Sequence, residues 1–364
     1  MTAVDAEKIR SALASVKDPA TGHPIAATGQ LRDVQVGDDA SVTLAVDTIS
    51  PGYPMAEALE ASIKDALATL ELPSVTVEFG LKVPHKPARA DLNRLPTVKN
   101  IIAIAAGKGG VGKSTLSVNT AMALQKLGAR VGLLDADIYD PSIPKMLGTA
   151  DREAGTAAEG SGIAPADYRG IPVMSVDYFV EPGKAVIWRG PMIHKLLTQF
   201  LEDVRWGELD YLIVDLPPGT GDAQLSLGQL VPITASVIVT TPQEVALIDV
   251  RKAVNMFKKL EVPVVGVVEN MSYYRCPSCG HHDEIFGVGG GKKLAAEFGV
   301  DVLGRVPIDP KVAFGGESGR PIVEAAPESD IAKSLIDVAA KAALRTSKLS
   351  ATGPKRSSLL RTVD

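Results

Sequence analysis

A glycine-rich segment restricts the fold of this chain more than any other feature. It reads Gly107-Lys108-Gly109-Gly110-Val111-Gly112-Lys113-Ser114-Thr115 and fits the pattern G-x-x-x-x-G-K-[ST]. An apolar run, residues 101–106, precedes it, and a segment with helical character, residues 114–127, follows it. A strand, a glycine-rich loop and a helix in this order predict a βαβ unit whose loop binds phosphate at the helix N-terminus.

The nine residues of this loop predict an ATP-binding site. The glycines have no side chains, so successive N–H groups can surround a phosphate; they are Gly107, Gly109, Gly110 and Gly112. Lys113 is expected to act in catalysis by neutralising the β- and γ-phosphates, and the Ser114 hydroxyl is expected to coordinate Mg²⁺. The alternative is a glycine-rich turn with an unrelated lysine. It does not explain why the loop comes directly between a predicted strand and a predicted helix.

Beyond residue 98, short apolar runs alternate with helical segments. The runs are residues 101–106, 131–135, 211–215, 237–241, 264–268 and 302–306, and the helical segments include 114–127, 191–204 and 243–260. Strands in which apolar and polar residues do not alternate are typical of a parallel sheet that is covered on both faces. We therefore expect residues 98–344 to form one doubly wound α/β domain of the P-loop NTPase type, with a mostly parallel sheet.

The two ends of the chain have a different character. Residues 1–85 predict a small α+β domain, with helices near 4–15 and 55–70 and strands near 31–36, 41–49 and 74–79. Residues 86–97 are predicted to be a linker, because the segment begins with prolines and basic residues. Residues 345–364 are basic and poor in large apolar side chains, so we expect a disordered tail.

The composition argues against several functions. The net charge of the 364 residues is −5, so no strong electrostatic field attracts nucleic acid. Only 4% of the residues are aromatic, so stacking on bases does not favour stable nucleic-acid binding either. No apolar run reaches the ~18 residues that span a bilayer, so membrane insertion is not expected. The N-terminal residues lack an apolar signal core, so we expect a cytoplasmic protein.

Three aspartates end predicted strands at the edge where open α/β sheets bind ligands. Asp137 is the candidate for positioning or deprotonating the attacking water in catalysis. Asp135 and Asp215 are candidates for holding Mg²⁺ or its water shell. The alternative for each is a capping role, since aspartate often caps turns between strands and helices.

Two loops and an asparagine complete the candidate nucleotide site. Residues 138–142 and 217–222 are expected to switch with the γ-phosphate. Asn270 closes another strand at the same edge, and its amide can pair with both a donor and an acceptor on adenine. A turn-forming asparagine is the alternative.

The only two cysteines, Cys276 and Cys279, form a C-x-x-C turn, which is half of a tetrahedral metal site. A cluster held by four thiolates needs four cysteines, and two copies of the chain around a twofold axis would supply them. This favours an iron–sulfur cluster at the axis of a homodimer. The alternatives are a structural zinc site completed by His281 and His282, or two inert cysteines.

The early lysine of the loop, Lys108, resembles that of the deviant phosphate-loop ATPases, the group of MinD, ParA and the nitrogenase iron protein. In that group the lysine reaches the partner's nucleotide across a dimer interface. The resemblance therefore implies that Lys108 binds the nucleotide of a second subunit and acts in catalysis there. A solvated surface lysine is the alternative.

Five motifs together resemble the Mrp/ApbC family of iron–sulfur cluster carrier ATPases; they are residues 107–115, 135–142, 188–192, 215–222 and 269–279. The resemblance extends from residue 98 to residue 340. It implies a homodimer, ATP binding with slow hydrolysis, and a bridging [4Fe–4S] cluster held by Cys276 and Cys279. It also implies that a donor loads the cluster and that apoproteins receive it.

Residues 1–85 resemble the small iron–sulfur assembly domain that is often fused ahead of this family. Many of those domains carry a cysteine in the turn that corresponds to residues 50–54, and this chain has none there. We therefore do not expect this domain to ligate a cluster.

Two further functions fit parts of the sequence. A positioning ATPase of the MinD or ParA kind needs a membrane helix or a basic DNA face, and the apolar pair Leu359-Leu360 is too short to anchor the chain firmly. A zinc-binding metallochaperone NTPase would use the C-x-x-C turn as a structural site.

Overall fold

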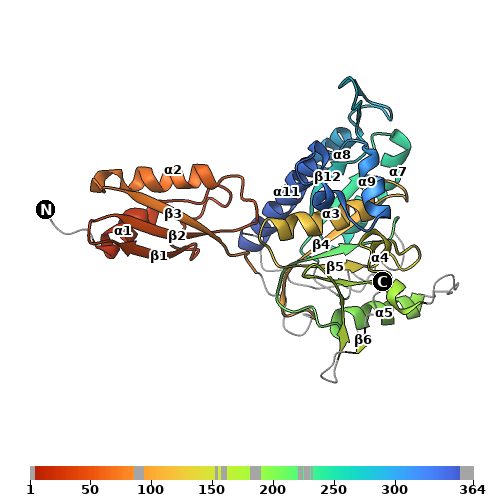
Figure 1. Ribbon diagram of the computed structural model, residues 1–364, viewed down its shortest axis with the longest axis horizontal. Coiled ribbons are helices and arrows are strands. Elements are labelled where there is room, and N and C mark those ends of the chain that lie inside the picture. Colours follow the sequence, from red (N-terminus) through yellow and green to blue (C-terminus); the bar gives the residue numbers. More distant parts are fainter. Residues whose placement is uncertain are drawn as a thin grey trace. The chain divides into compact units, whose positions relative to one another are not determined.

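The structure is a computed structural model that describes residues 5–85, 94–151, 155–156, 162–180, 190–219, 224, 230 and 233–352 (Figure 1). The chain forms two compact units. One contains residues 1–85 and 347–354, and the other contains residues 86–346 and 355–364. Within the described part of the chain, no helix has both the length and the hydropathy that crossing a bilayer requires.

The N-terminal unit combines two helices with a three-stranded sheet. The helices are α1 (Ala6–Ala12) and α2 (Ala56–Leu67). Strand β1 (Leu31–Val36) pairs antiparallel with β2 (Val42–Thr48), which pairs parallel with β3 (Val75–Leu81). The helices end earlier than the sequence predicts, because each continues as a 3-10 turn, η1 (Leu13–Ser15) and η2 (Ala68–Leu70).

The second unit is built on an eight-stranded sheet in the order β15-β12-β11-β4-β10-β5-β9-β8. The strands are β4 (Val98–Ala106), β5 (Val131–Asp135), β8 (Ala166–Tyr168), β9 (Ile171–Met174), β10 (Leu209–Asp215), β11 (Ala235–Thr240), β12 (Val264–Glu269) and β15 (Val302–Arg305). All neighbours are parallel except the β8–β9 pair. The predicted doubly wound, mostly parallel sheet is confirmed.

Helices cover both faces of this sheet. They are α3 (Lys113–Lys126), α4 (Ile143–Met146), α5 (Gly190–Glu202), α7 (Glu244–Lys259), α8 (Gly290–Phe298), α9 (Pro310–Glu317), α10 (Ile322–Ala325) and α11 (Asp330–Thr352), with a 3-10 turn η3 (Val176–Phe179). One apolar core joins α5, α7 and α8 to alternate residues of β4, namely Ile101, Ala103 and Ala105. The residues between them face the opposite side, where α3 packs.

The structure differs from the sequence expectations at three places. Helix α11 runs through Thr352 and buries Thr346 and Ser347, so residues 345–352 are helical instead of disordered. The short strand β6 (Gly155–Thr156) pairs antiparallel with β7 (Ile163–Ala164), and neither strand was expected. The β8–β9 hairpin was not expected. Residues 86–93 of the predicted linker and 353–364 of the predicted tail lie outside the described residues.

A buried polar network holds the N-terminal unit together. The carboxylate of Asp18 accepts hydrogen bonds from the Tyr53 hydroxyl at 2.8 Å, from Gln30 Nε2 at 3.0 Å and from the Thr21 amide at 2.8 Å. Burial and the neighbouring Asp18 raise the pKa of Tyr53, so its hydroxyl remains a donor. Asp18 is therefore a fixed acceptor that ties together the segment at Thr21, the residue before β1 and the segment at Tyr53.

Replacing Asp18 with alanine should destabilise this unit by about 2–4 kcal/mol, because several buried donors then lose their acceptor. Hydrogen exchange of peptides from residues 5–85, measured in the full chain, reports this loss as faster exchange. The matched control is Asp38→Ala, which removes an exposed carboxylate from the β1–β2 turn. Equal exchange in the two variants would contradict the structural role of Asp18.

Candidate functional site

The predicted phosphate loop lies between the end of β4 at Ala106 and the start of α3 at Lys113. Gly107 is required by close packing, because a Cβ there would lie 2.3 Å from the backbone nitrogen of Val250 in α7. Gly110 and Gly112 have φ angles of +76° and +85°, which side chains disfavour. A Cβ at Gly109 or Gly110 would meet no atom within 4 Å, so the open side of the loop is free for a ligand.

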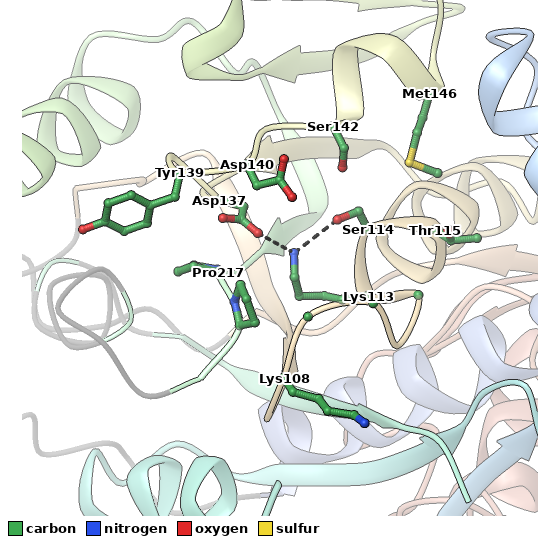
Figure 2. Close-up of a pocket in the computed structure, with 14 residues that line it drawn as sticks. Lys108, Lys113, Ser114, Thr115, Asp137, Tyr139, Asp140, Ser142, Met146 and Pro217 are labelled. Atoms are coloured by element: carbon green, nitrogen blue, oxygen red, sulfur yellow. Dashed lines mark hydrogen bonds and ion pairs between the residues drawn. The ribbon is translucent and has the colours of Figure 1, made fainter. Parts of the chain in front are cut away.

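The loop borders a cavity of about 600 Å³ (Figure 2). This volume is within the usual range for pockets that bind small molecules and cofactors. Its other walls come from the ends of neighbouring strands and from the loops after them; they are Asp137, Tyr139, Asp140, Ser142, Met146, Pro217 and Pro218. The structure thus brings the phosphate loop, the first aspartate segment and the start of the 217–222 loop to one cavity.

Lys113 is the charged centre of this cavity. Its Nζ lies 2.7 Å from Asp215 Oδ2 and 3.3 Å from Asp137 Oδ2, and only 7% of its side chain is exposed. Burial opposes the charged form of Lys113, but Asp215 and then Asp137 outweigh it and raise the pKa. The lysine therefore stays protonated, as a phosphate ligand must.

Asp215 is fully buried and accepts bonds from three side chains. Besides Lys113, the Ser114 hydroxyl donates to Oδ2 at 2.7 Å and the Ser117 hydroxyl donates to Oδ1 at 2.5 Å. Ser117 was not among the predicted site residues. Its position three residues after Ser114 puts both hydroxyls on the same face of α3, which is the sequence signal that would have found it.

Asp135 and Asp137 lie in different environments. Asp135 is 1% exposed, and burial followed by the charge of Asp215 raises its pKa well above the usual range. It accepts a hydrogen bond from Ser175 Oγ at 3.1 Å. Burial raises the pKa of Asp137, and Lys113 offsets only part of this shift.

The second oxygen of Asp137, Oδ1, is buried and accepts no hydrogen bond from the described residues. Such an oxygen beside a cavity suits a water molecule or the hydration shell of a cation. Together with Ser114 Oγ and Asp215, it gives the hard oxygen donors that Mg²⁺ prefers. No group of three or more histidine, cysteine or acidic side chains gathers into a metal site within the described residues, so Mg²⁺ would depend on nucleotide phosphates as further ligands.

The side chain of Lys108 points in a different direction from that of Lys113 (Figure 2). Lys108 borders the cavity, but its side chain points away from Lys113 and Asp137 (Figure 2). It forms no hydrogen bond or ion pair with any residue that the structure describes. A role toward the nucleotide of a second subunit remains a prediction.

Asn270 contacts the phosphate loop directly. Its Nδ2 donates to the carbonyl of Val111 at 2.8 Å, and its own backbone N–H donates to the carbonyl of Thr240 at 2.8 Å. Asn270 therefore braces the loop from the end of β12. Recognition of adenine by the same amide remains a prediction.

The two cysteines lie at the tip of a small hairpin. Strand β13 (Tyr274–Arg275) pairs antiparallel with β14 (His282–Asp283), and the Cys276 amide donates to the His281 carbonyl at 2.9 Å. Cys279 is exposed and Cys276 is half-buried. Hydrogen bonds from the backbone of Cys279 and then Ser278 lower the pKa of Cys276, which favours the thiolate that binds metals.

The histidines of this hairpin are not gathered with the thiols into one metal site among the described residues. The His282 ring instead packs against Tyr273, with ring centroids 4.2 Å apart. Two other predicted segments are only partly visible: residues 188–189 of the 188–192 motif and residues 220–222 of the second switch loop lie outside the described residues.

A phosphate loop between strand and helix, with a buried lysine among carboxylates at the carboxyl edge of a parallel sheet, defines a P-loop nucleotide-binding site. Residues 97–343 match the family model described as NUBPL iron-transfer P-loop NTPase, and residues 6–79 match that described as iron–sulfur cluster assembly protein. The chain belongs to the NUBPL iron-transfer P-loop NTPase family and carries an iron–sulfur cluster assembly domain ahead of the NTPase domain.

Several relatives cover nearly the whole chain. An iron–sulfur cluster carrier protein of Deinococcus radiodurans is 44% identical over 90% of this chain and 92% of its own length. One of Escherichia coli K12 is 43% identical over 88% of this chain and 87% of its own length. Among solved structures, a nucleotide-binding protein from Archaeoglobus fulgidus in complex with ADP is 39% identical, with a TM-score of 0.57 over 65% of this chain and 92% of that one.

Replacing Lys113 with alanine should weaken ATP binding by about 10- to 100-fold, because a charged donor to phosphate is lost. Titration with a fluorescent ATP analogue measures the change. The matched control is Lys126→Ala, which removes an exposed lysine from the last turn of the same helix. Unchanged affinity in the Lys113 variant would refute the assignment of the phosphate loop.

Replacing Gly109 with alanine should leave thermal stability close to that of the wild type, because the new Cβ meets no protein atom within 4 Å. The same Cβ enters the open side of the loop, so nucleotide affinity should fall by about tenfold or more. Thermal unfolding and nucleotide titration separate the two effects. If the variant binds ATP normally, the open side of the loop is not where phosphate binds.

Proposed function

We propose that this protein is an ATP-binding and ATP-hydrolysing iron–sulfur cluster carrier that holds its cluster between two copies of the chain. The observation that carries the proposal is the C-x-x-C turn at the exposed tip of a hairpin in the same unit as a P-loop site. The chain has no other cysteine, so a second copy must supply the remaining thiolates. Family membership and relatives named iron–sulfur cluster carrier protein support this function.

The cluster is cargo, and its position at a hairpin tip suits exchange. An exposed Cys279 gives a donor or an acceptor protein access to the cluster, while the lowered pKa of Cys276 favours the thiolate. We assign a [4Fe–4S] cluster at the twofold axis of a homodimer, loaded by a donor and delivered to apoproteins. The N-terminal unit has no cysteine and contributes no thiolate to it.

The residues around the cavity have separate tasks in hydrolysis. Lys113 exchanges its contact with Asp215 for the β- and γ-phosphates, which neutralises charge on the transferred group. Mg²⁺, held by Ser114 and Asp215 with Asp135 behind them, would supply further neutralisation of the phosphates. Asp137 orients the attacking water through its free oxygen, and Lys108 of a second subunit completes the charge balance.

Hydrolysis is then slow and serves to change conformation. The walls of the cavity include Tyr139, Asp140 and Pro217, which lie on the two segments predicted to switch. Loss of the γ-phosphate removes the ligand that holds these segments, so the contact between the two subunits changes. The free energy of hydrolysis is used for cluster release.

Anaerobic reconstitution tests the carrier function. The wild-type protein should become a brown dimer with about four iron and four sulfide per dimer, as a thiolate-held [4Fe–4S] cluster requires. Cys276→Ala and Cys279→Ala should each lose the iron, whereas Ser278→Ala, which changes a residue between them, should retain it. A monomer that binds iron tightly, or a colourless protein that binds zinc, would contradict the proposal.

A further inference from the structure

One short segment connects the phosphate loop to the cysteines. It begins at Glu269, the last residue of β12, and reaches Cys276 at the hairpin tip. Near its start, Asn270 donates to the carbonyl of Val111, and a Cβ on Gly112 would lie 2.2 Å from Asn270 Nδ2. The phosphate loop and Asn270 are therefore in such close contact that neither can shift without the other.

The rest of the segment is fixed along one side. The Ser272 amide donates to the Val306 carbonyl at 2.9 Å, and the Ile308 amide donates to the Tyr273 carbonyl at 2.7 Å. Tyr274, the first residue of the hairpin strand β13, forms a parallel bridge with Ile308. These bonds make the segment a continuous strip of ordered backbone up to Arg275, the residue before Cys276.

Glu269 anchors the start of the strip. It is 1% exposed, and its carboxylate accepts hydrogen bonds from the Ser272 hydroxyl, from the Gly291 amide at 2.6 Å and from Arg305 Nε at 3.1 Å. Hydrogen bonds thus hold Glu269 and Ser272 on either side of Asn270 and Met271.

Met271 has a φ of +53°, a left-handed conformation that is uncommon for a residue with a side chain. Strained backbone of this kind persists where the surrounding structure imposes it, and it often marks a point that changes conformation. It lies directly between the residue that contacts the phosphate loop and the anchored Ser272. A small rotation of the Asn270 peptide must therefore pass through Met271.

We propose that Asn270 is a positioning residue that transmits occupancy of the phosphate loop to Cys276 and Cys279. Phosphate draws the loop amides toward it and reorients the Val111 peptide, whose carbonyl holds Asn270. The change passes through the strained Met271 peptide to the hairpin and alters the exposure of the two thiols. The inference rests on the proposed function, because it explains how ATP would control release of a bound cluster.

The reactivity of the two thiols is a direct readout, since the chain has no other cysteine. The reduced, cluster-free protein is alkylated with iodoacetamide, with and without ATP and Mg²⁺, and the rate is followed by mass spectrometry. In the wild type, nucleotide should change the rate by about fivefold or more, the lower end of typical coupling between two sites. At saturating nucleotide, Asn270→Asp should lose this effect, because a carboxylate cannot donate to Val111.

Met271→Gly is the second variant. It retains the Asn270 side chain and its contact with Val111, but glycine absorbs the rotation without strain, so the nucleotide effect on the thiols should again be lost. The matched control is Asn119→Asp. Asn119 Nδ2 also donates to a carbonyl of this region, that of Thr115, at 2.8 Å, but its other contact is with Val323 of α10. This control should retain the nucleotide effect.

Affinities for ATP and GTP distinguish positioning from base recognition. Asn270→Asp should leave the preference between ATP and GTP unchanged if the residue acts through the loop. A variant that changes this preference while nucleotide still alters alkylation as in the wild type would overturn the proposal. If Asn270→Asp binds no nucleotide, Met271→Gly decides: a wild-type nucleotide effect in that variant also overturns the proposal.

Failure of this inference is distinguishable from failure of the carrier function. If the wild-type protein loads a cluster but nucleotide has no effect on its thiols, only the proposed role of Asn270 is overturned. If the thiols respond to nucleotide through Asn270 but the protein loads no cluster, the role of Asn270 is supported and the carrier function is contradicted.

Discussion

The buried ammonium group of Lys113 is the interaction on which the rest of the site depends. Strands β5 and β10 are paired so that Asp135 and Asp215 are direct neighbours at the sheet edge, and both are almost fully buried. Two buried carboxylates at one edge repel each other unless a cation or a proton offsets the charge. Lys113 supplies the cation toward Asp215, while burial and then the charge of Asp215 raise the pKa of Asp135. A phosphate that enters this site meets an ammonium group already held between Asp215 and Asp137.

The same sheet edge explains why nucleotide and cargo sites share one unit. Strand β4 leads into the phosphate loop, β10 into the 217–222 loop, and β12 into the segment that ends at the cysteines. Parallel strands bring all these carboxyl ends to one side, so the phosphate loop lies close in space to the segment that leads to the hairpin. The hydrogen bond between Asn270 and Val111 joins residues that are 159 positions apart. The control of the cysteines by nucleotide that we propose would require no new domain, only this contact between two loops of the sheet edge.

The sequence predicts well those parts whose physics is local. Strand β5 has the predicted limits, 131–135, because a short run without polar residues before its final aspartate is typical of a strand in a sheet covered on both faces. The phosphate loop is predicted for a similar reason, since only glycines permit its backbone. The β8–β9 hairpin was missed because its strands are very short and Pro172 interrupts the second. The last turns of α11 were missed because Ser347 and Ser350 are buried only by tertiary packing. Contacts such as Ser117 with Asp215 depend on the pairing of distant segments and are invisible to composition.

The most direct test of this account is a crystal structure of the protein with Mg²⁺ and a non-hydrolysable ATP analogue. In this structure, the Nζ of Lys113 should leave Asp215 and contact oxygens of the β- and γ-phosphates. The phosphate loop amides from Gly109 to Ser114 should point at those phosphates, and Asp137 should face the γ-phosphate. A nucleotide bound elsewhere, with Lys113 still paired to Asp215 and Asp137, would contradict it.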